Sequence, residues 1–229
     1  NMTLEIQKDA VLLGSEHAED YPYHYKLYPY LKDERYYGLI NAKPDANGNR
    51  LKNIRIIGEG VIDGNGWKMN AAGTEYLYRK DTVEKDGTLG KNHVLNIGIL
   101  AADQMKALKR DYNLDIKKAY PRRTSLILMQ GVDHLYYGGV TVRNPANHTI
   151  INQHCNDVVI ENIDFKTYNC NNGDGIEFAH GSGLMVINNR FDTGDDCVNF
   201  AAGQGKLGAQ DPATQNIWIF NNSFHINYW

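Results

Sequence analysis

Two short glycine-flanked segments hold three aspartates whose types and spacing could do chemistry. Asp174 lies in the run Asn-Asn-Gly-Asp-Gly-Ile-Glu, and Asp195 and Asp196 lie in the run Thr-Gly-Asp-Asp-Cys-Val, which places Asp195 21 residues after Asp174. Carboxylates that are crowded together repel one another, so at least one pKa rises and keeps a proton available near neutral pH. A protonated carboxyl beside ionised ones supplies a general acid and a general base, the pairing that cleavage of a glycosidic bond requires.

Other interpretations of these aspartates stay open at this point. Gly-Asp-Gly and Gly-Asp-Asp are also ordinary turn sequences, because Asp tolerates left-handed backbone geometry and bonds its own backbone. Clustered carboxylates can also bind calcium through their oxygens. Each segment alone is therefore a weak signal, and the pair is specific only if the fold brings the two segments together.

A repeat in the second half of the chain indicates how the fold could do so. Residues 157–165, 183–191 and 216–224 align with asparagine at the sixth position and phenylalanine at the ninth, and earlier copies begin at His134 and Asn53. Short β-rich runs with polar corners, repeated every 20 to 50 residues or so, are typical of a solenoid. The sequence therefore predicts an all-β fold, a right-handed parallel β-helix in which each repeat is one coil.

This fold makes predictions about the residues in register. The phenylalanines should stack in the interior, and the asparagines could form an amide ladder at one corner. These residues are Phe165, Phe191 and Phe224, and Asn162, Asn188 and Asn221. Neighbouring coils lie about 4.8 Å apart, so a spacing of about one coil should bring the three aspartates to one patch of the outer wall. A β-sandwich also has many short strands, but it does not require equivalent residues to recur in register.

The domain organisation is predicted to be simple. Residues 1–229 are long enough for one core, so we expect a single β-helix domain. An insertion at about 70–123 interrupts the repeat, and Ala101, Met105 and Leu108 within it follow the spacing of a short helix. The insertion either shapes a binding face or only covers the core, and both interpretations stay open.

The composition excludes several classes of partner. The net charge is −3 and the basic residues form no block, so no nucleic-acid-binding stripe is predicted. No apolar run is long enough for a membrane-spanning helix. The spacing of Cys155, Cys170 and Cys197 fits no zinc pattern. We expect these cysteines to be small apolar core residues, with a Cys155–Cys170 bridge as the alternative, and we expect a monomer.

The two aspartate segments resemble motifs of the polygalacturonases, glycoside hydrolase family 28. Asn172–Gly175 is similar to the family's Asn-Thr-Asp-Gly motif, and Gly194–Asp196 is similar to its Gly-Asp-Asp motif. The run Ile57–Trp67 resembles an early coil of the family, and Val142–His148 and Val198–Gly203 resemble its bacterial exo-acting branch. The resemblance covers nearly the whole chain.

The resemblance implies hydrolysis of α-1,4 bonds in polygalacturonate, exo-acting and inverting, with no metal or cofactor. It implies that Asp195 is the general acid and that Asp174 and Asp196 hold and activate the water. Asn172 and His148 become candidate substrate contacts, although His148 could equally be a corner histidine bonded to the backbone. The partner is then pectin or an oligogalacturonide. The substrate class also implies a secreted or periplasmic location, although no signal peptide is visible.

The chain also departs from the family pattern. Gly173 replaces the usual Thr, and Glu177 stands where an Asp is common. We expect both ends to be truncated, because the family's Gly-His-Gly motif would fall at 227–229 and its Arg-Ile-Lys motif would lie beyond them. His225 is nearby, but a surface histidine is the simpler interpretation. The resemblance therefore implies that this chain alone is inactive or severely impaired.

Two other functions remain as alternatives. A non-catalytic carbohydrate-binding β-helix would keep the fold without turnover. A calcium-dependent pectate lyase is less favoured, because lyases lack the paired aspartate motifs and would require calcium and an arginine base.

Overall fold

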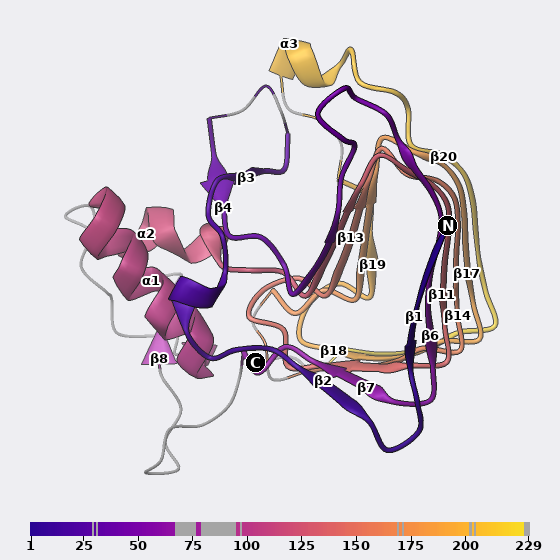
Figure 1. Ribbon diagram of the computed structural model, residues 1–229, viewed down its shortest axis with the longest axis horizontal. Helices are drawn as coiled ribbons and strands as arrows, with labels where there is room; N and C mark the ends of the chain where they lie inside the picture. Colours follow the sequence, from indigo (N-terminus) through magenta and orange to yellow (C-terminus); the bar gives the residue numbers. More distant parts are fainter. Residues whose placement is uncertain are drawn as a thin grey trace.

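Parallel strands stack into a right-handed solenoid in the computed structural model of the chain (Figure 1). The structure describes residues 1–28, 30, 32–66, 77–78, 95–96, 98–168, 170, 172–201, 203 and 205–226. Three parallel sheets run along the solenoid, and each full coil adds one strand to each sheet. The predicted β-helix is confirmed.

The three sheets are named here in the order in which a coil visits them. The first sheet consists of β1 (Met2–Ile6), β6 (Leu51–Gly58), β11 (Val132–Gly138), β14 (Asn156–Glu161), β17 (Ser182–Ile187) and β20 (Gln215–Phe220). The second consists of β2 (Val11–Leu13), β7 (Val61–Asp63), β12 (Thr141–Arg143), β15 (Asp164–Thr167), β18 (Arg190–Thr193) and β21 (Ser223–Ile226). The third consists of β5 (Ile40–Ala42), β10 (Ile127–Gln130), β13 (Ile150–Gln153), β16 (Ile176–Ala179) and β19 (Val198–Asn199).

The aromatic stack follows the predicted register. Phe165 and Phe191 lie 4.5 Å apart between ring centroids, and Phe191 and Phe224 lie 5.2 Å apart, with nearly parallel planes in both pairs. Phe165 and Phe191 are completely buried, whereas Phe224 is 49% exposed. Phe224 therefore joins the stack as predicted but is not fully interior, because β21 is the outermost strand of the second sheet among the described residues.

Asparagines turn the corner between the first and second sheets. Asn162, Asn188 and Asn221 all have left-handed backbone, with φ between 55° and 59°, a conformation that Asn tolerates better than most residues. The side-chain amide of Asn221 donates to the side-chain oxygen Oδ1 of Asn188. This hydrogen bond is one rung of the predicted ladder. A similar contact, which was not predicted, follows one residue later, where Asn189 Nδ2 donates to Asn222 Oδ1 at 3.0 Å.

The cysteines behave as core residues. All three are buried and form no disulfide, so the alternative Cys155–Cys170 bridge is absent.

Two excursions cover the outer side of the third sheet and one of its corners. The strands β3 (Tyr25–Lys26) and β4 (Glu34–Arg35) form an antiparallel hairpin, and Tyr25 packs on Leu128 and Ile151 of the sheet below it. The helix α1 (Gly98–Tyr112) is the one predicted in the insertion, with Leu100, Ala101 and Leu108 buried. It lies beside the solenoid with α2 (Ile116–Ala119), as Figure 1 shows.

The remaining short elements complete the description. They are the 3₁₀ turns η1 (Ala18–Asp20) and η2 (Tyr120–Arg122), the helix α3 (Gly205–Gly208) and the pair β8 (Leu77–Tyr78) and β9 (Leu95–Asn96). Most of the insertion between 67 and 97 lies outside the described residues.

Among the described residues, the helices are all too short or too polar to cross a bilayer.

Candidate active site

The three aspartates meet where the second sheet passes into the third. Asp174 precedes β16, and Asp195 and Asp196 lie in the next coil between β18 and β19. Each offers a carboxylate oxygen within 4.8 Å of the others. Asp174 is buried and Asp196 is exposed, so the cluster reaches from the wall to the surface. The one-coil spacing thus brings the two segments together, as the sequence predicts.

Backbone hydrogen bonds between the coils hold the two segments in place. Gly175 N donates to Asp196 O at 2.9 Å, and Thr149 N of the preceding coil donates to Asp174 O at 2.9 Å. A Cβ atom on Gly175 would lie 2.5 Å from the Cys197 carbonyl oxygen, and one on Gly173 would lie 2.5 Å from the Thr167 carbonyl oxygen. The Gly173 departure from the family's Thr therefore suits this close approach of the backbone.

The Asp174 carboxylate accepts a hydrogen bond at one oxygen and faces a histidine at the other. Asn199 Nδ2 donates to Oδ2 at 2.6 Å, and His148 Nε2 lies 3.7 Å from Oδ1. Burial raises the pKa of Asp174, and the charges of Asp195 and Asp196 act in the same direction, whereas His148 and Asn199 oppose the rise. Asp174 therefore holds a proton to higher pH than an ordinary aspartate.

Asn172, a predicted substrate contact, touches the cluster itself. Its Nδ2 donates to Asp195 Oδ2 at 3.3 Å, and its Oδ1 accepts from Arg123 Nη2 at 3.2 Å. Arg123 is completely buried, donates to the carbonyl oxygens of Tyr120 and Ala146, and stacks on the Tyr120 ring at 3.8 Å. Arg123 thus orients Asn172, and Asn172 orients Asp195.

His148, the second predicted contact, lies between two carboxylates. Its Nδ1 is 2.9 Å from Glu177 Oε2, and its Nε2 faces Asp174. Glu177 is only 3% exposed. The ring thus pairs with an acidic side chain and borders the aspartate cluster, and its role toward substrate stays a prediction.

Sequence reasoning missed Arg123, Glu177 and Asn199. Arg123 lies in the irregular end of the insertion, where no pattern marks a buried cation. Glu177 and Asn199 could have been predicted from the sequence, because they follow the two aspartate segments and occupy equivalent positions of neighbouring strands. Their outward position on the third sheet, next to the cluster, was the available signal.

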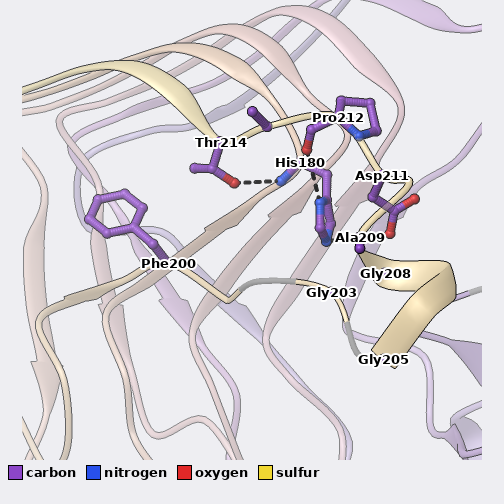
Figure 2. A pocket seen from close by; sticks show the side chains of 10 residues that line it. His180, Phe200, Gly203, Gly205, Gly208, Ala209, Asp211, Pro212 and Thr214 are labelled. Atoms are coloured by element: carbon purple, nitrogen blue, oxygen red, sulfur yellow. Dashed lines mark hydrogen bonds and ion pairs between the residues drawn. The ribbon is translucent and has the colours of Figure 1, made fainter.

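A second group of titratable residues lies at the other end of β16. Figure 2 shows His180 beside Asp211 in a pocket closed by α3 and the segment after it. His180 Nε2 and His154 Nε2 each lie 3.5 Å from an Asp211 oxygen, and the two rings stack with centroids 5.2 Å apart. The length of β16 separates this group from Asp174, so it is not part of the carboxylate cluster.

His225 lies away from the interior. It is exposed in β21 and pairs in register with Asp192. This position agrees with the interpretation of a surface histidine.

Cleavage of a glycosidic bond by hydrolysis requires a pair of carboxylates, and this parallel β-helix gathers three at one corner. The family model "Glycosyl hydrolases family 28" matches residues 107–225. The exo-poly-alpha-D-galacturonosidase of Dickeya chrysanthemi is 43% identical over 227 residues, which is 98% of this chain and 37% of that protein.

Solved structures agree with this match. The family 28 exopolygalacturonase of Yersinia enterocolitica is 42% identical with a TM-score of 0.79, over 96% of this chain and 39% of that one. The polygalacturonase of Erwinia carotovora ssp. carotovora has a TM-score of 0.63 at 20% identity, over 96% of this chain and 48% of that one, which is a likeness of fold.

The chain belongs to glycosyl hydrolases family 28, because the family model matches more than half of it. It spans less than half the length of the Dickeya and Yersinia relatives.

Proposed function

We propose that this chain carries the catalytic centre of an exo-acting polygalacturonase, which hydrolyses α-1,4 bonds of polygalacturonate. The observation that carries the proposal is the convergence of Asp174, Asp195 and Asp196 within 4.8 Å at one corner of the solenoid. Both the Dickeya and the Yersinia relatives, each more than 40% identical, are exo-acting on galacturonan by name. Export to the periplasm or the medium would bring the protein to this substrate.

The roles follow the family motifs. Asp195 donates a proton to the leaving oxygen, while Asp174 and Asp196 hold and deprotonate the attacking water. Asp195 is supported for this role by Asn172, which fixes one of its oxygens. Burial and the two neighbouring aspartates raise the pKa of Asp174 on balance, and Asn199 and His148 limit that rise, which favours the ionised form that a base requires.

The stereochemical outcome rests on the family resemblance alone. The oxygens of the cluster lie within 4.8 Å, closer than the roughly 6.5–9.5 Å between the two carboxyl groups of many inverting enzymes. The expectation that the carboxylates stand far enough apart to admit a water is therefore not supported by this spacing. Proton NMR of the first-formed product distinguishes inversion, which gives the β-anomer, from retention.

The test of the proposed function compares the chain with its Asp195→Asn variant on trigalacturonate. Galacturonate release and binding are measured on the same samples. We expect slow release by the unmodified chain, a loss of about a hundredfold or more in the variant, and similar binding by both. Asp157→Asn, an exposed aspartate of the first sheet, is the matched control and should retain the release.

Other outcomes would contradict the proposal. Near-normal release by Asp195→Asn would remove Asp195 from the acid role. Binding without any release by the unmodified chain would favour the non-catalytic carbohydrate-binding function. Unsaturated products that absorb ultraviolet light and disappear with a chelator would indicate a lyase.

A further inference from the structure

Four ionisable side chains, basic and acidic in turn, lie in a row from the hairpin to the aspartate cluster. They are Arg35, Glu177, His148 and Asp174. His148 Nδ1 is 2.9 Å from Glu177 Oε2, and His148 Nε2 is 3.7 Å from Asp174 Oδ1. The His148 ring thus bridges two carboxylates that belong to the next coil.

The geometry favours the doubly protonated His148 ring. A neutral imidazole has one N–H and one lone pair. If Nδ1 donated to Glu177, the lone pair of Nε2 would face the oxygen of Asp174, and the opposite tautomer would create the same conflict at Glu177. An imidazolium donates toward both carboxylates and removes the conflict.

Glu177 lies between the third sheet, which carries it, and the β3–β4 hairpin, which covers it. Glu177 is in β16 and points outward, in register with Ile151 of the neighbouring strand. The hairpin covers this row, since Tyr25 packs on Ile151. Tyr25 and Arg35 are paired across the hairpin, so their side chains point to the same side. The Arg35 charge therefore acts on Glu177 from above.

We propose that Glu177 and His148 are a positioning pair for catalysis: Glu177 holds the His148 imidazolium, and the imidazolium holds the Asp174 carboxylate ionised beside Asp195 and Asp196. The pair touches no reacting atom and acts through Asp174. The inference rests on the proposed function, because it concerns the residue that is to activate the water.

The charges facing each group support this arrangement. Burial is the largest single influence on His148 and Glu177 and disfavours their charged forms, but their mutual hydrogen bond and the surrounding charges together outweigh it, so the pKa of His148 is raised and that of Glu177 is lowered. Asp174 adds to the rise at His148, and Arg35 opposes it. The Tyr25 and Tyr28 hydroxyls also border Glu177, and burial raises the pKa of both, so they stay neutral.

The first arm of the test uses NMR and requires no turnover. Ring ¹⁵N shifts follow the titration of His148, and carboxyl ¹³C shifts follow that of Asp174, assigned with His148→Gln and Asp174→Asn. We expect Glu177→Gln to lower the His148 midpoint and His148→Gln to raise the Asp174 midpoint. His17→Gln, an exposed histidine, is the control that should leave the Asp174 midpoint unchanged. An unchanged His148 midpoint in Glu177→Gln, or an unchanged Asp174 midpoint in His148→Gln, would overturn the inference.

The second arm is the pH profile of kcat on trigalacturonate. Since the base must be ionised, removing the cation should move the acid limb to higher pH in His148→Gln, with a smaller effect on KM. Glu177→Asp should partly restore the profile that Glu177→Gln displaces, because it returns the negative charge. A uniform loss of kcat with an unmoved acid limb would show a merely structural role. If the chain does not act on galacturonate at all, the proposed function fails, while the NMR arm still decides the pairing.

Discussion

The chemistry of the three aspartates is set by neighbours that the two motifs do not contain. Asn172 and Arg123 act on Asp195, whereas Asn199 and His148 act on Asp174. Chemically identical carboxyls therefore receive different surroundings, which is how one cluster can supply both an acid and a base. The exposed third carboxyl, Asp196, gives the cluster its opening to solvent.

Arg123 is the neighbour whose loss should cost the fold most. Its guanidinium donates to the Tyr120 and Ala146 carbonyls inside the protein, and removing it leaves buried acceptors without donors. We expect Arg123→Met to lower the free energy of unfolding by about 3 kcal/mol, measured by urea denaturation. Arg190→Met, at an exposed position of β18, is the control and should change stability little. Equal effects of the two substitutions would show that burial of Arg123 is not what matters.

At the scale of elements, the coil is held by residues that repeat at equivalent positions. Phe191 lies between Phe165 and Phe224 in the aromatic stack. Because Phe191 is buried and Phe224 is half-exposed, Phe191→Ala should cost about 3–5 kcal/mol of unfolding free energy, and Phe224→Ala should cost clearly less. Chemical denaturation of both variants measures the difference. A larger loss in Phe224→Ala would contradict the burial argument.

These repeats explain how far the sequence could predict the structure. Coils must place equivalent residues in register, so Phe165, Asn162 and the spacing of the aspartates were enough to predict the β-helix and the meeting of the two motifs. The hairpin that carries Arg35 has no repeat partner, and its place depends on packing over a sheet built from later residues. Arg123 and Glu177 likewise acquire their roles only from residues of other coils.

The segment after α3 is attached to the solenoid through Asp211, which lies beside His180 (Figure 2). The Asp211 carboxylate also contacts His154, whose ring stacks on that of His180. Burial lowers the pKa of His154, with Asp211 opposing. A lowered folded-state pKa contributes stability above the unfolded pKa of about 6.5, and this contribution is lost as the pH falls through the folded value. We expect His154→Asn to reduce the loss of unfolding free energy between about pH 7.5 and 5, measured by urea denaturation.

His134→Asn is the matched control for this element, since both histidines have left-handed backbone and an aspartate neighbour. Its pH dependence of stability should follow that of the unmodified chain. A flattened profile in the control, or an unchanged one in His154→Asn, would assign the acid sensitivity to other groups.

At the scale of the whole molecule, the candidate site lies near one end of the described solenoid. Two of its aspartates, Asp195 and Asp196, lie in the coil that contains β18 and β19. Among the described residues, β19 is the outermost strand of the third sheet. Asp195 and Asp196 thus have a neighbouring coil on one side, while Trp218, Phe220 and Phe224 of the outermost strands are about half-exposed.

This one-sided site leads to the last prediction, on turnover by the chain as given. The galacturonate carboxylate is repelled by three nearby aspartates unless a cation receives it, and His148 is already engaged by Glu177 and Asp174. Loss of positioned catalytic partners commonly costs about a hundredfold or more. We therefore expect the 229-residue chain to release galacturonate from trigalacturonate at least about a hundredfold more slowly than the Dickeya chrysanthemi relative under the same conditions. Comparable rates would show that groups within this chain already complete the site.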